Sequence, residues 1–185
     1  LSSSSAASDV YKRQAMISEK LGWPVIADAL NPLRSHAEEN PLLITRYDAF
    51  LRDAHKADGI LPTAILQIGS LPTSKVLRAW LSSLDAVSFL LTSCPINPDP
   101  LHRIATPLYG DVQTLAEHLQ PQRIEANWGK QWSAIEQETA NELDSKILSI
   151  DTMFEGKVAW LLSKHLPVDT PVSYTHLTLP TKRIV

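Results

Sequence analysis

Residues 69–75 (GSLPTSK) form the segment of this sequence whose residue types and spacing could do chemistry. The segment follows an apolar run of strand length and precedes a helical pattern, and it nearly fits the phosphate-binding pattern GxxxxGK[ST]. Three departures argue against a phosphate-binding loop of that kind. Ser74 replaces the second glycine, Val76 replaces the hydroxyl that binds Mg²⁺, and Pro72 removes a backbone N–H donor.

Lys75 remains a candidate for binding an anion. It lies at the carboxyl end of a strand, where open α/β sheets bind ligands, and beside the free N–H groups of a helix start. A positive charge there costs about 0.3–1 kcal/mol, so a lysine at this position suits a substrate carboxylate. A solvated lysine in a first helical turn is the alternative, and the pattern alone favours it. We take Lys75 and its neighbour Ser74 as candidate substrate-binding residues, and either Thr73 or Ser74 can cap the helix.

The remaining polar residues form no recognisable catalytic or metal motif. The sequence has no GxGxxG, HExxH, CxxC or GxSxG pattern, so dinucleotide binding, zinc binding and a serine nucleophile elbow have no support. Asp28 and Arg34 could reach a ligand from the loop after the first strand, but an ordinary ion pair between them is the simpler interpretation. Five of the six histidines are scattered between residues 36 and 165 and predict surface or loop positions: His36, His55, His102, His118 and His165.

Alternating strand and helix patterns must position this loop. Four runs are typical of strands, and the second is apolar on both sides, as in a parallel strand covered on both faces: 23–29, 64–69, 86–93 and 105–112. A first predicted helix ends at Gly22. Apolar residues at helical spacing predict helices in five later segments: 42–57, 71–84, 114–119, 130–150 and 154–167. The order predicts the α/β class, a Rossmann-like parallel sheet with helices on both faces. The five tryptophans fall mostly on apolar faces and predict core or interface positions.

Composition narrows the range of partners. The 185 residues include 17 basic and 20 acidic residues, a net charge of −3. An acidic chain without a basic run argues against binding to nucleic acid or to an anionic membrane surface. No apolar run approaches the roughly 18 residues of a membrane span. Cys94 is the single cysteine, which rules out an internal disulfide and favours a reducing compartment.

The two ends differ in character from the rest. Residues 1–14 and 172–185 resemble peptides translated from sequencing-adapter DNA, and we expect both to be non-native. Without them the net charge is −6, because they hold four basic residues and one acidic residue. The expected organisation is therefore a central α/β domain with a linker helix over 15–150, followed by one further helix over 151–171.

Four strings carry a resemblance to a known family. In order along the chain they are LGWPVIADALNPLR (21–34), NPLLITRYDAFLRD (40–53), ILQIGSLPTSKVLRAWL (65–81) and NPDPLHR (97–103). Together they resemble the central domain of 2-succinyl-5-enolpyruvyl-6-hydroxy-3-cyclohexene-1-carboxylate synthase. The resemblance covers about residues 15–171 and implies that the chain is an internal fragment of such an enzyme, with residues 151–171 opening its C-terminal cofactor-binding domain.

The resemblance implies a transferase of menaquinone or phylloquinone biosynthesis that uses thiamine diphosphate and Mg²⁺. Such enzymes decarboxylate 2-oxoglutarate and add the succinyl unit to isochorismate, and they are cytoplasmic dimers or tetramers. Lys75 matches a family lysine that faces the substrate pocket, but Val76 stands where many members have an arginine. The resemblance places the cofactor-binding and metal-binding residues outside this chain.

The resemblance also implies that the first strand of the domain precedes residue 15. Because the first strand of a doubly wound sheet is usually central, its loss would leave a sheet incomplete at its N-terminal edge, with unpaired backbone groups on two strands. We therefore expect the isolated chain to be unstable and inactive. Two other hypotheses stay open: a Rossmann-like non-catalytic ligand-binding or interaction domain, and the central domain of another thiamine-diphosphate decarboxylase or synthase.

Overall fold

The structure, a computed structural model, divides the chain into two compact units that meet within one long helix, at residues 142 and 143. Each unit is described by itself. The residues that the structure describes are 13–29, 31, 33–34, 40–93, 101, 104–120 and 127–167.

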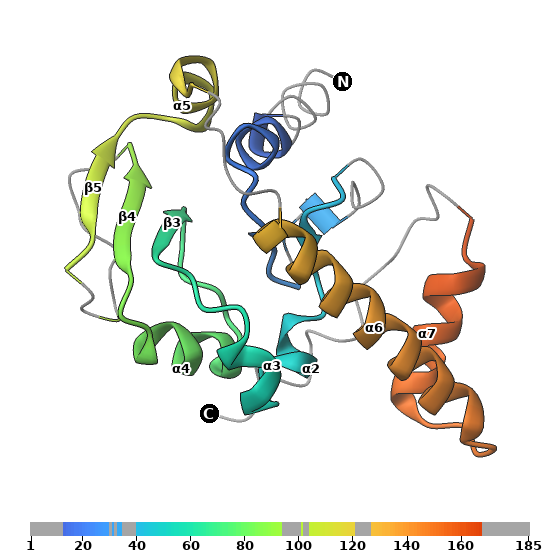
Figure 1. The fold of residues 1–185 in the computed structure, drawn as a ribbon. Helices are drawn as coiled ribbons and strands as arrows, with labels where there is room; N and C mark the ends of the chain where they lie inside the picture. Colours follow the sequence, from blue (N-terminus) through green and yellow to red (C-terminus); the bar gives the residue numbers. More distant parts are fainter. Residues whose placement is uncertain are drawn as a thin grey trace, which may run out of the picture. The chain divides into compact units, whose positions relative to one another are not determined.

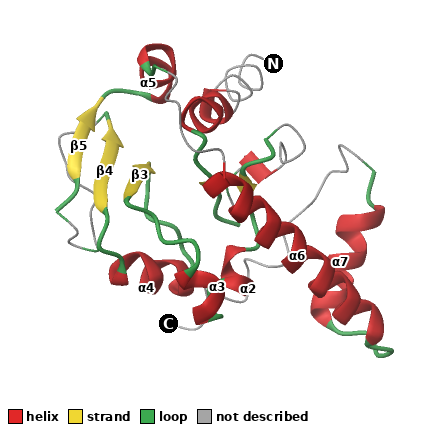
Figure 2. Cartoon of the chain, in the orientation of Figure 1, coloured by secondary structure: helices red, strands yellow, loops and turns green. Residues whose placement is uncertain are grey.

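Two parallel sheets form the first unit. One pairs β1 (Val25–Ile26) with β2 (Leu43–Ile44), and the other has the order β3 (Ala64–Ile68), β4 (Val87–Thr92), β5 (Thr106–Tyr109). Strands alternate with helices along the chain (Figures 1 and 2). The predicted α/β class, with parallel strands and helices on both sides, is confirmed, although the described strands form two sheets rather than one.

The predicted helix over residues 42–57 is wrong at its start. Leu43 and Ile44 form β2, and two short helices follow, α2 (Tyr47–Phe50) and α3 (Ala54–Asp58). Leu43 and Ile44 are both buried, and a short continuous apolar run does not reveal by its spacing whether it is strand or helix. Asp53 begins α3, because its side chain accepts a hydrogen bond from the His55 N–H.

The other predicted helices are confirmed, with ends that move by a few residues. The first helix covers residues 13–21 and ends at Gly22, which has a φ of 63°. The remaining four are α4 (Lys75–Ser83), α5 (Val112–His118), α6 (Asn127–Ser149) and α7 (Glu155–His165).

An aromatic cluster forms the centre of the first unit's core. The Trp132 side chain is only 1% exposed, and its ring meets those of Phe50, Trp80 and Trp128 edge-on at centroid distances of 5.8–5.9 Å. Edge-to-face contacts of this kind add about 0.5–1.5 kcal/mol each beyond the area that they bury. The prediction that these tryptophans belong to the core is therefore confirmed.

The part of helix α6 that belongs to the first unit, residues 127–142, is held there by close packing and by one carboxylate. A Cβ atom added to Gly129 would lie 2.8 Å from the backbone oxygen of Gly22, so only glycine allows this approach. Glu136 accepts hydrogen bonds from the backbone N–H groups of Thr45 and Arg46, at 3.1 and 3.0 Å, and pairs with the Arg46 guanidinium. Residues about 90 positions apart thereby fix the start of α2.

The second unit, residues 143–185, has little interior among its described residues. Helix α7 has no buried residue, and its apolar side chains Val158 and Leu162 are 44% and 48% exposed. Asp144 of α6 accepts a hydrogen bond from the Trp160 Nε1 at 2.6 Å and from the Lys164 Nζ at 2.8 Å. Polar contacts to one carboxylate therefore hold α7 to the end of α6.

Candidate functional site

The junction between β3 and α4, residues 69–75, is the site that the sequence singles out. Strand β3 ends at Ile68, and Gly69 then takes a φ of 77°, a backbone conformation that strains any residue with a Cβ atom. The chain turns there and reaches the first residue of α4, Lys75, six positions later. The predicted arrangement, in which a strand leads through a loop to a helix start, is present.

Ser74 caps α4. Its Oγ accepts a hydrogen bond from the Leu77 N–H at 3.1 Å and donates one to the Asp48 carboxylate at 2.5 Å. The first contact satisfies one of the N–H groups that a helix start leaves without a partner in the helix. The second ties the loop to α2. The Ser74 hydroxyl thus donates within the protein and acts here as a positioning group.

Thr73 is held by a second carboxylate, that of Asp28 at the end of the first strand region. Asp28 accepts hydrogen bonds from the Thr73 N–H at 3.0 Å and from the Thr73 hydroxyl at 2.8 Å. The Tyr47 hydroxyl donates to the same carboxylate at 3.1 Å. We call these contacts, together with that between Ser74 and Asp48, the two-carboxylate clamp.

The clamp favours the ionised form of both carboxylates. Burial is the largest single influence on the pKa of Asp28 and opposes ionisation, but the hydrogen bonds from Thr73, Ala29 and Tyr47 together outweigh it, so the pKa is lowered. The hydrogen bond from Ser74 is the main cause of the lowered pKa of Asp48. Burial, and then the negative charge of Asp28, raises the pKa of Tyr47 to about 12.

Lys75 is exposed, and no described residue accepts a hydrogen bond from its ammonium or pairs with it. The next basic residue along α4, Arg78, is used internally, because its Nε donates to the backbone oxygen of Pro72 at 2.6 Å. The ammonium group of Lys75 therefore has no described partner, and it lies at a helix start that the two-carboxylate clamp holds in place.

A cavity of about 500 Å³ adjoins the junction within the first unit. Residues 70–73 of the loop line part of it, together with Asp28 and the two strands β1 and β3. Neither Ser74 nor Lys75 lines this cavity, and its described lining contains no lysine or arginine. The structure therefore places the two predicted site residues beside the cavity rather than within it.

The ion pair predicted between Asp28 and Arg34 is wrong. Arg34 instead donates to the backbone oxygens of Ala27, at 3.1 Å, and Thr45, at 2.5 Å. The Asp28 carboxylate faces Thr73, 45 residues further along the chain, so spacing within the loop could not reveal the pairing. The available signal was a carboxylate that follows another strand of the predicted sheet.

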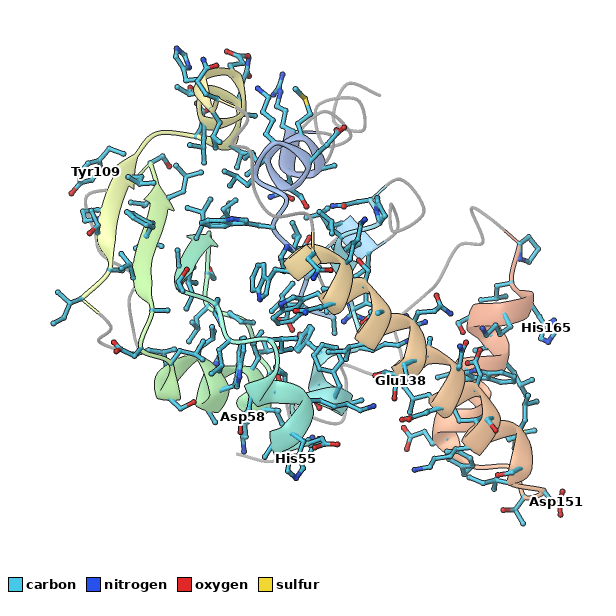
Figure 3. The ribbon with its side chains drawn as sticks, viewed as in Figure 1. His55, Asp58, Tyr109, Glu138, Asp151 and His165 are labelled. Atoms are coloured by element: carbon cyan, nitrogen blue, oxygen red, sulfur yellow. The ribbon has the colours of Figure 1, made fainter. Side chains whose placement is uncertain are left out.

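Within the described ranges no group of three histidine, cysteine, aspartate or glutamate side chains could hold a metal ion. His55 of α3 and His165 of α7 are exposed (Figure 3). His118 is exposed as well, and all three agree with the prediction of surface histidines. His36 and His102 lie outside the described residues. The described helices include none that is both long enough and apolar enough to cross a membrane.

Comparison with known proteins shows the family to which this chain belongs. A family model described as the middle domain of thiamine pyrophosphate matches residues 7–172. The chain belongs to this family of thiamine pyrophosphate middle domains. The match begins inside the segment 1–14, which the sequence alone led us to expect to be non-native.

Curated relatives agree with the resemblance found in the sequence. The chain is similar to three proteins named 2-succinyl-5-enolpyruvyl-6-hydroxy-3-cyclohexene-1-carboxylate synthase. They come from Rippkaea orientalis (37% identical over 156 residues, 82% of this chain), Gloeothece citriformis (38% over 160, 85%) and Synechococcus elongatus (37% over 166, 89%). The resemblance to this synthase is confirmed. The chain spans only 26–28% of the length of these relatives.

Proposed function

We propose that this chain is the middle domain of a thiamine-diphosphate-dependent synthase that decarboxylates 2-oxoglutarate and adds the succinyl unit to isochorismate. The parent enzyme is then a transferase of menaquinone or phylloquinone biosynthesis. The confirmed family and the names of the relatives support this function. The chemistry itself belongs to parts of the longer enzyme that this chain does not match.

Within that enzyme, Lys75 supplies a positive charge for a substrate carboxylate. The observation that carries this role is the geometry of the junction: an exposed cation at the first position of α4, with no partner among the described residues, on a loop fixed by the two-carboxylate clamp. Both 2-oxoglutarate and isochorismate are carboxylates. Ser74 contributes to substrate binding by holding the helix start in place.

The described residues do not fit thiamine diphosphate or its metal ion. The described lining of the cavity offers no cationic residue to hold a diphosphate, and no described cluster of side chains suits Mg²⁺. The proposed cofactor and Mg²⁺ sites therefore belong to the remainder of the parent enzyme. Residues 151–171 open its cofactor-binding domain, and the parent is a cytoplasmic dimer or tetramer.

A chimera tests the proposed function with the catalytic parts present. Residues 15–150 of this chain replace the matched region of the Rippkaea orientalis relative, and the product formed from 2-oxoglutarate and isochorismate is measured with thiamine diphosphate and Mg²⁺ added. We expect turnover within about tenfold of that relative. A chimera that keeps the relative's oligomeric state and melting temperature but forms no product would contradict the proposal.

The role of Lys75 is tested in the same chimera. Lys75→Ala removes a charge-assisted contact worth about 1.5–3 kcal/mol, so we expect kcat/KM to fall roughly 10- to 100-fold, with partial recovery in Lys75→Arg. Lys130→Ala is the matched control, because Lys130 is also exposed and also lies in the first turn of a helix. Equal activity of Lys75→Ala and Lys130→Ala would remove Lys75 from the site.

A further inference from the structure

The short helix α2 contacts both halves of the two-carboxylate clamp. The hydroxyl of its first residue, Tyr47, donates to Asp28 at 3.1 Å, and the carboxylate of its second residue, Asp48, accepts from Ser74 at 2.5 Å. The position of α2 therefore bears on both carboxylates at once. Whatever fixes the start of α2 also influences the helix start on which Lys75 lies.

The sequence of α2 gives it little means of fixing its own start. The helix covers only four residues, Tyr47–Phe50, and isolated helices of that length are unstable in water. Arg46, which precedes the helix, makes no side-chain hydrogen bond that caps it. Contacts from other parts of the chain must therefore set where α2 begins.

Glu136 of α6 supplies such contacts through one carboxylate. Its Oε1 accepts hydrogen bonds from the Thr45 N–H at 3.1 Å, from the Thr45 hydroxyl at 2.7 Å and from the Arg46 guanidinium at 2.9 Å. Its Oε2 accepts from the Arg46 N–H at 3.0 Å. The Glu136 side chain is only 12% exposed. Because hydrogen bonds to an ionised acceptor are strong, two consecutive N–H groups held by one carboxylate leave the backbone before α2 little freedom to shift.

The same face of α6 also packs against the far end of α2. Trp132 lies four residues before Glu136, so the two side chains project from one face of the helix. The Trp132 ring meets the ring of Phe50, the last residue of α2, edge-on at 5.9 Å. Apolar burial keeps α2 on the core but is non-directional, whereas the hydrogen bonds to Glu136 define where the helix begins.

We propose that Glu136 is a positioning residue for Lys75. Its carboxylate fixes the start of α2, and α2 presents Tyr47 and Asp48 to the clamp. The clamp in turn holds the start of α4, where Lys75 lies. The inference rests on the proposed function, in which Lys75 binds a substrate carboxylate.

Hydrogen exchange tests this linkage without substrate, in the chimera that carries residues 15–150. Glu136→Gln keeps the size of the side chain but removes its charge and replaces one acceptor oxygen with a donor. We expect exchange to be about tenfold faster in a peptide that covers residues 45–50 and about threefold faster in 70–77, with little change around Thr114. Faster exchange at 45–50 with unchanged exchange at 70–77 would overturn the proposal.

Glu138→Gln is the matched control. Glu138 lies on the same helix (Figure 3), its side chain is 56% exposed, and it pairs with Lys56 of α3, which is no part of the clamp. The substitution removes the same charge from the same helix, and we expect exchange at 45–50 and 70–77 to match that of the unmodified chimera. Equal acceleration of 70–77 in both glutamine variants would assign the effect to the charge of α6 and overturn the proposal.

Turnover tests whether Glu136 acts through Lys75. Glu136→Gln and Lys75→Ala, alone and combined, form a double-mutant cycle. We expect Glu136→Gln to lower kcat/KM about threefold when Lys75 is present and to have almost no further effect in the Lys75→Ala background. A residue that only stabilises the fold would lower activity by the same factor in both backgrounds, and that result would overturn the proposal.

Thr45→Val is a gentler variant if the Glu136→Gln chimera fails to fold. Valine has nearly the shape of threonine, and the change removes the hydroxyl that donates to Glu136 at 2.7 Å. We expect about twofold faster exchange at 70–77 and the same dependence on Lys75. Unchanged exchange at 70–77 would overturn the proposal by this route as well.

Failure of this inference and failure of the proposed function give different results. If Lys75→Ala lowers kcat/KM but Glu136→Gln acts equally in both backgrounds, the proposed function stands and Glu136 has no positioning role. Full activity of Lys75→Ala removes Lys75 from the site and overturns both.

Discussion

The starts of α4 and α5 look alike locally but are held differently. Each follows a parallel strand and a glycine, and each has a small polar cap: the Ser74 Oγ accepts from the Leu77 N–H at 3.1 Å, and the Asp111 carboxylate accepts from the Thr114 N–H at 2.8 Å. Among the described hydrogen bonds, only the α4 start is also tied to distant side chains, through the two-carboxylate clamp, whereas the cap of α5 has only the charge attraction of Arg13. Asp111 is exposed.

The difference separates making a helix start from fixing it in space. A cap satisfies the first N–H groups of a helix but leaves the loop before it free to shift. Asp28 and Asp48 add contacts from residues 45 and 26 positions earlier, which bind the loop to β1 and α2. A charged side chain presented from the α4 start is thereby held in a defined place, as substrate recognition requires.

Loss of Asp28 should have the largest effect. Asp28→Ala leaves the Thr73 N–H and hydroxyl without their acceptor, and we expect a local cost of about 2 kcal/mol. In the chimera, hydrogen exchange measured by mass spectrometry should be about 30-fold faster in a peptide that covers residues 70–77, with little change around Thr114.

Asp85→Ala is the control for that substitution, because Asp85 is exposed and lies in the loop after α4. We expect its exchange pattern to match that of the unmodified chimera. Equal exchange in the Asp28 and Asp85 variants would mean that the clamp does not stabilise the junction. The start of α4 would then be held no more firmly than the start of α5.

Acidification should weaken the clamp. The pKa of Asp28 is lower in the folded protein than the usual value near 3.9, so its contribution to stability is complete above that value and disappears as the pH falls through the lowered folded pKa. Protection of residues 70–77, corrected for intrinsic exchange, should therefore be constant from pH 7 to about 5 and decline below about 4.

Asp28→Asn tests the origin of that decline. The amide introduced by this substitution cannot titrate, so the acid response of residues 70–77 should shrink. The response around Thr114 should persist, because the pKa of Asp111 is also lowered, chiefly by the Thr114 N–H. An unchanged acid response at residues 70–77 in this variant would assign it to Asp48 or to general unfolding.

Local features of the junction could be predicted from the sequence, whereas the clamp could not. The strand, the loop, the helix start and the two candidate caps, Thr73 and Ser74, all follow from apolar spacing and residue types over about 20 consecutive positions. The partners of Asp28 depend on which strand ends become neighbours, which no local pattern encodes. The strand at Leu43–Ile44 was missed for a related reason, because two apolar residues show no period.

Removing the caps should have intermediate effects that differ between the two helices. Ser74→Ala loses the cap and the link to Asp48, and we expect about 1 kcal/mol, or about fivefold faster exchange in the first turn of α4. Asp111→Ala should have a smaller effect on α5, because water competes for an exposed cap. Hydrogen exchange of both first turns, measured in both variants, checks the order, and a reversed order would contradict the account of the clamp.

A charge reversal at Lys75 should have the smallest effect on stability and a large one on function. A carboxylate suits the positive end of the helix dipole better than an ammonium does, so Lys75→Glu should slow exchange in the first turn of α4 by about two- to fivefold. The same change places a negative charge where the proposed function needs a cation, so turnover in the chimera should fall below that of Lys75→Ala. If Lys75→Glu stabilises the first turn of α4 but lowers turnover, Lys75 favours activity at the expense of helix stability. Lys75→Glu chimeras that keep full activity would instead mean that the rigid start of α4 serves the fold alone.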